Sequence, residues 1–198
     1  MFYKKWKKLA FAITLMMLIF IPWDIFFTYK GIWDFNHRFI IGYEIFHLPL
    51  EEWLFFIIIP FCCVFIHEIL NYYYPIKLKS CRLIKKITLM IIIILLLLSF
   101  LFFSKLYTFV CFLFTSIVLL IVLFIRDEIW LYKSLRTYFF TLFPFLIVNG
   151  FLTGSFTDAV VLYNDMEILG IRCLNIPIED FIYNLALIMV VLLFYQPK

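Results

Sequence analysis

Charged residues are scarce in this sequence. They make up 15% of the chain, whereas hydrophobic residues make up 66%. A soluble domain carries about 25% charged and roughly 45–50% apolar residues. The excess of apolar side chains is too large for a surface that faces water. Soluble, disordered and collagen-like proteins are therefore excluded, and the composition indicates an integral membrane protein.

Glycine and paired cysteine motifs are also in short supply. The five glycines form neither a GxGxxG nor a GxxxxGK[ST] motif, so the common nucleotide-phosphate loops are absent. The five cysteines include no CxxC pair, which argues against a disulfide framework or a zinc ribbon. Cys63 and His67 lie four residues apart, but no third ligand is evident, and we expect no metal site.

Long apolar runs are what the chain has instead. A membrane-spanning helix needs roughly 20 mostly apolar residues. Six segments approach this length: 9–27, 53–72, 87–103, 107–125, 138–153 and 181–195. The first is followed by Pro22-Trp23-Asp24 rather than by a small-residue cleavage site, so we interpret it as a retained helix. The predicted fold is all-α and polytopic, with about six transmembrane helices.

The charges are distributed unequally between the predicted connections. With the N-terminus in the cytoplasm, 13 of the 17 basic residues lie inside. Those 13 are Lys4, Lys5, Lys7, Lys8, Lys77, Lys79, Arg82, Lys85, Lys86, Arg126, Lys133, Arg136 and Lys198. Ten of the 13 acidic residues lie outside, in or beside the long loops 28–52 and 154–180. The basic excess therefore indicates topology by the positive-inside rule, and no nucleic-acid partner is expected.

The two long loops resemble each other. A shift of 128 residues aligns 36–53 with 164–181 without a gap. The identical pairs fall mainly on residue types that are rare in this chain: Asn36/Asn164, Ile40/Ile168, Gly42/Gly170, Pro49/Pro177 and Glu51/Glu179. The pattern predicts a parallel internal repeat, with both copies running the same way through the membrane.

The repeat suggests three parts for the chain. Residues 1–72 form the first unit, 73–106 a linking loop and helix, and 107–198 the second unit. The second unit has helix 107–125 in front of its loop-bearing pair, and the first unit has no counterpart to it. Two parallel three-helix units joined by one helix would give seven spans, whereas this chain shows six.

Each copy of the repeat opens a helix with paired carboxylates. The motifs are Pro49-Leu50-Glu51-Glu52 and Pro177-Ile178-Glu179-Asp180. A proline at a helix start followed by a glutamate that caps the first turn is a purely structural explanation. It does not account for a second carboxylate in both copies, and carboxylates at the membrane boundary are functional candidates. A carboxylic acid kept neutral in an apolar pocket could protonate an alkene, and aromatic faces could hold the resulting cation.

Further candidates lie near these motifs. Asp24 sits at the end of the first helix, and Asn149 occupies a similar place in the second copy if a three-residue insertion is allowed. A solvated helix-end residue is the alternative interpretation for Asp24. The supporting candidates of the site are Trp23, Trp33, Pro49, Trp53, Asn164, Pro177 and Phe181.

Together these motifs resemble the small membrane lycopene cyclases, in which two homologous units act as a heterodimer or as one fused chain. The resemblance rests on Trp23-Asp24, Gly31-Ile32-Trp33, Leu48 to Trp53 and Phe55-Phe56 in the first unit. In the second unit it rests on Asn149-Gly150, Leu152-Thr153, Tyr163-Asn164, Ile168 to Arg172 and Ile176 to Phe181. Fused relatives usually carry another span before the basic segment at 3–7, with which this chain begins.

The resemblance implies a redox-neutral cyclase of carotenoid biosynthesis without a flavin or other cofactor. Its substrate would be lycopene, whose linear ends close to β-ionone rings through acid catalysis, giving γ-carotene and β-carotene. The family's acidic motif maps onto Glu51, Glu52, Glu179 and Asp180. We expect Glu51 and Glu179 to be the acids and their neighbours to tune them. The implied location is the bacterial cytoplasmic membrane, with the bilayer, a second copy or other carotenoid enzymes as partners.

Other functions remain open on the sequence. A cyclase of the same family could act on another end group or form an ε ring. A prenyltransferase would need magnesium-binding aspartate pairs, and Asp24 and Asp34 are badly spaced for that. A small-solute transport subunit would need a polar path, whereas the spans carry almost no charge between their ends.

Overall fold

The structure is a computed structural model, and it describes residues 2–76 and 81–196. Its main elements are six long helices: α1 (Trp6–Tyr29), α2 (Leu50–Tyr73), α3 (Arg82–Leu101), α4 (Leu106–Ile125), α5 (Glu128–Leu152) and α6 (Ile178–Tyr195). A short 3₁₀ turn, Phe2–Lys5, precedes α1. All six helices are long and apolar enough to cross a membrane, which confirms the predicted all-α membrane fold.

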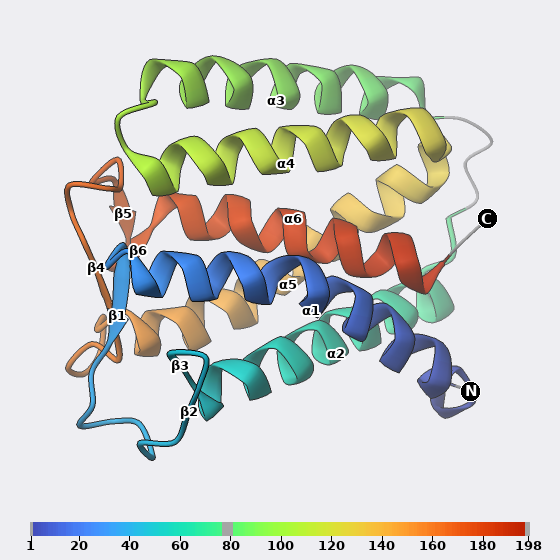
Figure 1. Cartoon of the computed structure of the whole chain (residues 1–198). Coiled ribbons are helices and arrows are strands. Elements are labelled where there is room, and N and C mark those ends of the chain that lie inside the picture. The colour runs from blue at the N-terminus through green and yellow to red at the C-terminus, as the bar shows by residue number, and fades with distance from the viewer. Residues whose placement is uncertain (1, 77–80, 197–198) are drawn as a thin grey trace.

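The helices alternate in direction, so that the chain's ends gather on one side (Figure 1). The long loops after α1 and α5 both lie at the opposite end of the bundle, as predicted (Figure 1). The basic residues Lys77, Lys79 and Lys198, which we assigned to the inner side, lie outside the described residues.

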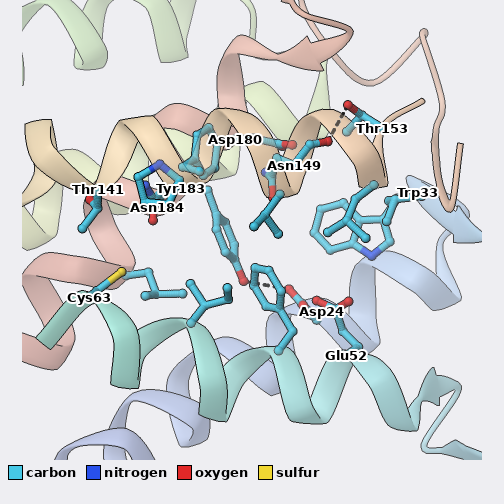
Figure 2. Close-up of a pocket in the computed structure, with 18 of the residues that line it drawn as sticks. Asp24, Trp33, Glu52, Cys63, Thr141, Asn149, Thr153, Asp180, Tyr183 and Asn184 are labelled. Atoms are coloured by element: carbon cyan, nitrogen blue, oxygen red, sulfur yellow. Dashed lines mark hydrogen bonds between the residues drawn. The ribbon is translucent and has the colours of Figure 1, made fainter. Parts of the chain in front are cut away.

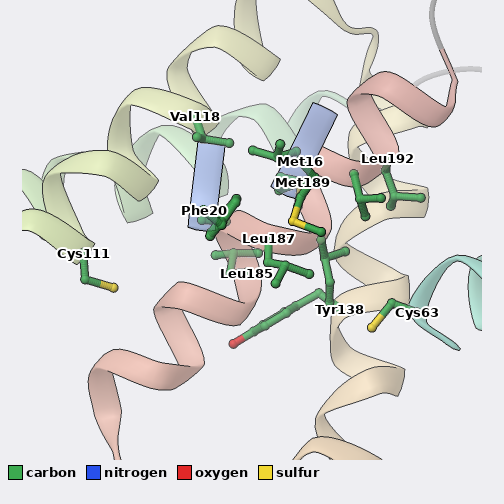
Figure 3. Packing of buried hydrophobic residues seen from close by; sticks show 14 of the residues in the cluster. Met16, Phe20, Cys63, Cys111, Val118, Tyr138, Leu185, Leu187, Met189 and Leu192 are labelled. Carbon is green, nitrogen blue, oxygen red and sulfur yellow. The ribbon is translucent and has the colours of Figure 1, made fainter. Parts of the chain in front are cut away.

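Helix α6 is the centre of the bundle. It packs against α1, α2, α4 and α5, and 67% of its 18-residue membrane-spanning stretch is buried inside the protein. Met16 and Phe20 of α1 and Val118 of α4 pack around Leu187 and Met189 of α6 (Figure 3). A helix that is apolar on all sides is stable in such a position because every face finds a protein neighbour. Helix α3 packs mainly on α4 at the edge of the bundle, and only 22% of its membrane-spanning stretch is buried inside the protein.

Helix α5 begins ten residues earlier than the predicted span 138–153. Asp127 caps it, since its side chain accepts a hydrogen bond from the Trp130 amide at 2.7 Å. The added turns contain Lys133 and Arg136, which hydropathy alone reads as a loop. The prolines of the two motifs, Pro49 and Pro177, are the N-cap residues of α2 and α6. They precede the first helical position, at which we expected them.

The loops contain six short strands. These are β1 (Trp33–Phe35), β2 (Glu44–Ile45), β3 (Leu48–Pro49), β4 (Val161–Tyr163), β5 (Arg172–Cys173) and β6 (Ile176–Pro177). Strands β2 and β3 form one hairpin, and β5 and β6 form another. Strands β1 and β4 pair antiparallel with Asp34 opposite Leu162, which joins the two loops.

The two loops make the same contacts at the offset of 128 residues. The Leu50 amide donates to the Tyr43 carbonyl at 2.9 Å, and the Ile178 amide donates to the Ile171 carbonyl at 3.0 Å. The hairpin tips at 46–47 and 174–175 both have positive φ. The β1–β4 ladder is centred on Asp34 and Leu162, which are also 128 residues apart. These contacts favour the predicted repeat of the loop regions, while a duplication of whole helical units stays a prediction.

Candidate functional site

A cavity lies between α2 and α5, at the end of the bundle that carries the loops (Figure 2). Its volume is about 130 Å³. Helices α1, α4 and α6 and strands β1 and β4 complete its wall. Most of the lining is apolar or aromatic, and none of the lining residues is Lys or Arg. A cavity of this kind favours an apolar ligand.

Three carboxyl groups meet in this apolar setting. Asp24 comes from the end of α1, Glu52 from the first turn of α2 and Asp180 from the first turn of α6. Asp24 is 3% exposed and Asp180 is 5% exposed, whereas Glu52 is partly buried. Isolated buried charges are costly, so such a cluster persists only when hydrogen bonds or shared protons stabilise it.

Two tyrosines hold the Asp180 carboxyl. The Tyr107 hydroxyl donates to Asp180 Oδ1 at 2.7 Å, and the Tyr163 hydroxyl donates to Oδ2 at 2.8 Å. Desolvation raises the pKa of the Tyr163 hydroxyl well above its usual value, and the nearby Asp180 carboxylate adds to the effect. Tyr163 therefore keeps its proton and remains a donor. With a donor on each oxygen, Asp180 is well suited to be the ionised member of the cluster.

Asp24 and Glu52 form a pair. Both side chains line the cavity with their carboxyl groups close together (Figure 2), and the Tyr183 hydroxyl donates to Asp24 Oδ1 at 3.0 Å. Ionised carboxylates are acceptors only, so a hydrogen bond between two carboxyl groups requires one proton on the pair. Two carboxyl groups this close in an apolar cavity favour sharing one proton, because a second charge beside the first is costly.

Glu51 and Glu179 lie elsewhere, although they are the neighbours of Glu52 and Asp180 in sequence. Neither lines the cavity. Glu51 Oε1 accepts the Ile41 amide at 2.7 Å, and Glu179 Oε1 accepts the Leu169 amide at 2.7 Å. Glu179 also accepts the Thr108 hydroxyl at 2.5 Å. These carboxylates fasten the loops to the helix starts, and the acid role that we expected for them stays a prediction.

The other predicted site residues divide between the cavity and its surroundings. Trp33 and Asn149 line the cavity, and Trp33 Nε1 donates to the Thr28 hydroxyl at 3.0 Å. Trp23 does not line the cavity but packs against Tyr183, which does, with ring centroids 5.2 Å apart. Phe181 packs against Phe145 at 5.0 Å.

Four predicted residues support the loops instead. Trp53 Nε1 donates to the Ile45 carbonyl at 3.3 Å. Asn164 donates to the Gly31 carbonyl at 3.5 Å and accepts from the Met166 amide at 3.1 Å. Pro49 and Pro177 end the hairpins as the helix N-caps.

Sequence reasoning missed the tyrosines that hold the carboxyl groups. Tyr107, Tyr163 and Tyr183 come from α4, β4 and α6, and they are scattered among 12 tyrosines in the sequence. Tyr107 and Tyr163 stack at 6.1 Å, and Trp33 meets Tyr107 edge to face at 5.1 Å. A polar tyrosine in an otherwise apolar span was the available signal for Tyr107 and Tyr183.

Of the Cys63–His67 pair, Cys63 lines the cavity, whereas His67 lies toward the other end of α2 and has its own partners. His67 is buried, with Nδ1 2.7 Å from the Thr137 hydroxyl and Nε2 3.2 Å from Gln196. Glu68 forms an ion pair with Lys5 at 2.6 Å and accepts the Tyr195 hydroxyl at 2.9 Å. These bonds join the 3₁₀ turn before α1 with α2, α5 and the end of α6.

Comparison with known proteins shows the family of this chain. Residues 1–70 and 104–197 match the family described as lycopene cyclase, and the unmatched stretch between them contains α3. The chain belongs to the lycopene cyclase family. No solved structure matches it.

One curated relative of this lycopene cyclase family member is a bifunctional lycopene cyclase/phytoene synthase of Leptosphaeria maculans. The two are 39% identical over 51 residues, which is 26% of this chain and 9% of the relative. The aligned part therefore spans less than a tenth of that protein's length.

Proposed function

We propose that this chain is a lycopene cyclase that closes the linear ends of lycopene to β-ionone rings by acid catalysis. The observation that carries the proposal is the carboxyl cluster of Asp24, Glu52 and Asp180 inside an apolar, aromatic cavity. Family membership supports a cyclase activity. The six apolar helices support a membrane location, and we propose the bacterial cytoplasmic membrane.

The reaction needs one proton in and one proton out. The Asp24–Glu52 pair delivers its proton to the terminal double bond of the linear end group, which leaves a tertiary cation. The neighbouring double bond attacks that cation, so that a ring carbon–carbon bond forms and the positive charge moves into the ring. Loss of a ring proton to a carboxylate then forms the new double bond. The product is an isomer of the substrate, and no electrons are exchanged.

The surroundings of the carboxyl cluster suit these steps. Trp33, Tyr107 and Tyr163 form a connected group of rings at the cavity wall. Aromatic faces stabilise a nearby cation without reacting with it. The apolar lining excludes water, which would otherwise trap the cation as an alcohol.

We assign the acid to the Asp24–Glu52 pair and the base to Asp180. The pair can hold a transferable proton, whereas the two tyrosine donors favour the carboxylate form of Asp180. Both halves of the chain thus contribute to one cavity. A symmetric substrate would present its two ends to it in turn.

Carboxamide variants test the assignment. Glu52→Gln and Asp180→Asn should each lower ring formation per folded molecule by roughly 10²–10⁴-fold, the contribution of general acid–base catalysis. The matched controls are Glu51→Gln and Glu179→Gln, whose side chains lie outside the cavity and which should retain most of the activity per folded molecule.

The measurement is pigment chromatography from lycopene-accumulating cells, normalised to folded protein. It reports activity, ring type and the number of closed ends together. Full activity of both Glu52→Gln and Asp180→Asn would contradict the proposal. Loss of activity in the two controls alone would return the acid role to Glu51 and Glu179.

A further inference from the structure

The mouth of the cavity is marked by its exposed lining residues. Among the described residues that line the cavity, Cys62 and Val148 are the two that are exposed. Cys62 is on α2 and Val148, at 38% exposure, is on α5. Asp24, Trp33, Tyr107 and Asp180 are buried on the walls formed by the other elements. We therefore place the opening of the cavity between α2 and α5.

Helices α2 and α5 are fastened to each other away from this mouth. His67 meets Thr137 at 2.7 Å, and Arg136 donates to Asn71 at 3.0 Å and to the Tyr74 carbonyl at 2.8 Å. These bonds lie toward the end of the bundle that carries the termini. The cavity separates the two helices in the half that carries the loops.

The depth of the mouth places it in the hydrocarbon layer. Cys62 is 12 residues beyond the start of α2, which corresponds to about 18 Å at 1.5 Å per residue. That distance is near the middle of a bilayer whose apolar core is about 30 Å thick. Val148 lies closer to the loop end of α5. An opening at this depth faces lipid chains rather than water.

The chemistry of the mouth agrees with its position. On the two helices that flank it, the cavity is lined by Phe55, Ile59 and Cys62 of α2 and by Phe145, Val148 and Leu152 of α5. None of these side chains carries a charge. The carboxyl cluster lies behind them. Such a route admits a hydrocarbon chain end and is unfavourable for an ion or a sugar, which would lose its hydration without compensation.

We propose that Cys62 and Val148 frame a lateral portal between α2 and α5, through which one end of a linear isoprenoid hydrocarbon passes from the bilayer to the carboxyl cluster. This inference rests on the proposed function for the identity of the substrate. The portal determines access, and the carboxyl cluster performs the chemistry. Because both ends of lycopene are apolar, either end can pass, leave and be replaced by the other.

Steric variants test the portal. Val148→Trp and Cys62→Trp should narrow it and reduce ring formation in membranes by about tenfold, the low end of steric discrimination in an apolar pocket. The effect should appear at limiting lycopene as a raised KM. Ile147→Trp and Ile57→Trp are matched controls, since both side chains are exposed on the same helices but do not line the cavity. Equal activity of the portal and control variants would overturn the proposal.

A second measurement is independent of turnover. A photoreactive benzoylphenylalanine at position 148, in phosphatidylcholine–phosphatidylglycerol vesicles, should form adducts with lipid acyl chains on illumination. Added lycopene should replace the lipid adduct with a polyene adduct at position 148 but not at position 147. Adducts that are unchanged by lycopene at both positions would show that the polyene does not pass there.

The two measurements separate this proposal from the proposed function. A polyene adduct at position 148 together with full activity of Glu52→Gln and Asp180→Asn would keep the portal and overturn the assigned chemistry. Inactive carboxamide variants together with active, unlabelled position-148 variants would keep the chemistry and overturn the portal.

Discussion

The two adjacent carboxylates of each motif point in different directions, because a helix turns by about 100° per residue, and they therefore have different contacts. Glu52 and Asp180 face the cavity, whereas Glu51 and Glu179 accept amide hydrogen bonds from the loops. The paired motif therefore combines a chemical group with a structural one in each half of the chain. Helix capping explains the first carboxylate of each motif but does not explain the second.

Removing the tyrosine donors from Asp180 should weaken catalysis. A hydrogen bond to a charged group contributes about 1.5–3 kcal/mol. We expect Tyr107→Phe or Tyr163→Phe to slow ring formation by about tenfold or more, and the double variant to be slower still. Tyr72→Phe is the control, because Tyr72 is 79% exposed at the other end of α2. Pigment yields per folded protein check this, and an unimpaired double variant would show that the tyrosines do not act on Asp180.

The two loop-fastening glutamates should differ in their effect on stability. Glu179 is fully buried and accepts from both Thr108 and Leu169, whereas Glu51 is partly exposed and accepts from Ile41. Glu179→Leu leaves buried donors without an acceptor, which costs about 1–3 kcal/mol for each such group. Glu51→Leu should cost less, because lipid headgroups or water can replace its oxygen. Thermal unfolding in detergent measures the difference, and an equal loss in both variants would contradict this explanation.

At the scale of elements, the hairpins at the loop end hold strained turns. Phe46 and His47 have φ of 55° and 64°, and Leu174 and Asn175 have φ of 48° and 59°. Two consecutive positive φ values are typical of type I′ turns, which favour Asn-Gly. Phe46, His47 and Leu174 are therefore unfavourable residue types in their own turns. The pairing of β2 with β3 and of β5 with β6 keeps them in place.

Replacing Phe46-His47 by Asn-Gly should stabilise the protein by about 1 kcal/mol or more, since a left-handed conformation costs a side-chain-bearing residue about 1–2 kcal/mol. Gly170→Ala should destabilise the protein, because Gly170 has φ of 80°, which strains a residue with a side chain. An added Cβ would meet no atom within 4 Å, so the strain of the backbone is the whole effect. Melting followed by circular dichroism compares the two variants. A less stable Asn-Gly variant would mean that Phe46 makes a contact that outweighs the strain.

At the scale of the whole molecule, the loops are joined across the bundle. Strands β1 and β4 bring the first and second halves together directly above the carboxyl cluster, and Tyr163 reaches Asp180 from β4. Asp24 and Glu52 come from the first half, and Asp180 and Tyr183 from the second. Neither half contains the whole cluster. The site therefore requires both halves to be packed together.

The orientation in the membrane stays a prediction, and two native cysteines can test it. Cys173 is the last residue of β5, and Cys81 precedes α3 at the opposite end of the bundle. With the basic residues inside, a membrane-impermeant maleimide should label Cys173 in intact cells and Cys81 only after the membrane is opened. Cys173→Ser and Cys81→Ser variants assign the labelled sites. The reverse order of labelling would invert the topology.

The sequence by itself determined the membrane class and the approximate spans, and it predicted the correspondence of the two loops. These follow from local properties, namely the length of apolar runs, the position of basic residues and the recurrence of Asn, Gly, Pro and Glu. The sequence did not predict where α5 begins. Lys133 and Arg136 lower the hydropathy of its first turns, and the hydrogen bond by which Asp127 caps the helix is visible only in the structure.

Only the tertiary structure decided which carboxylates share the cavity. Glu51 and Glu52 are chemically alike, and their facing directions depend on how α2 packs against α5 and α6. Tyr107, Tyr163 and Tyr183 reach the cluster from three separate elements, so no spacing in the chain predicts them together. The physical reason is that an acid–base site depends on distances and desolvation, and both are set by residues far apart in the sequence.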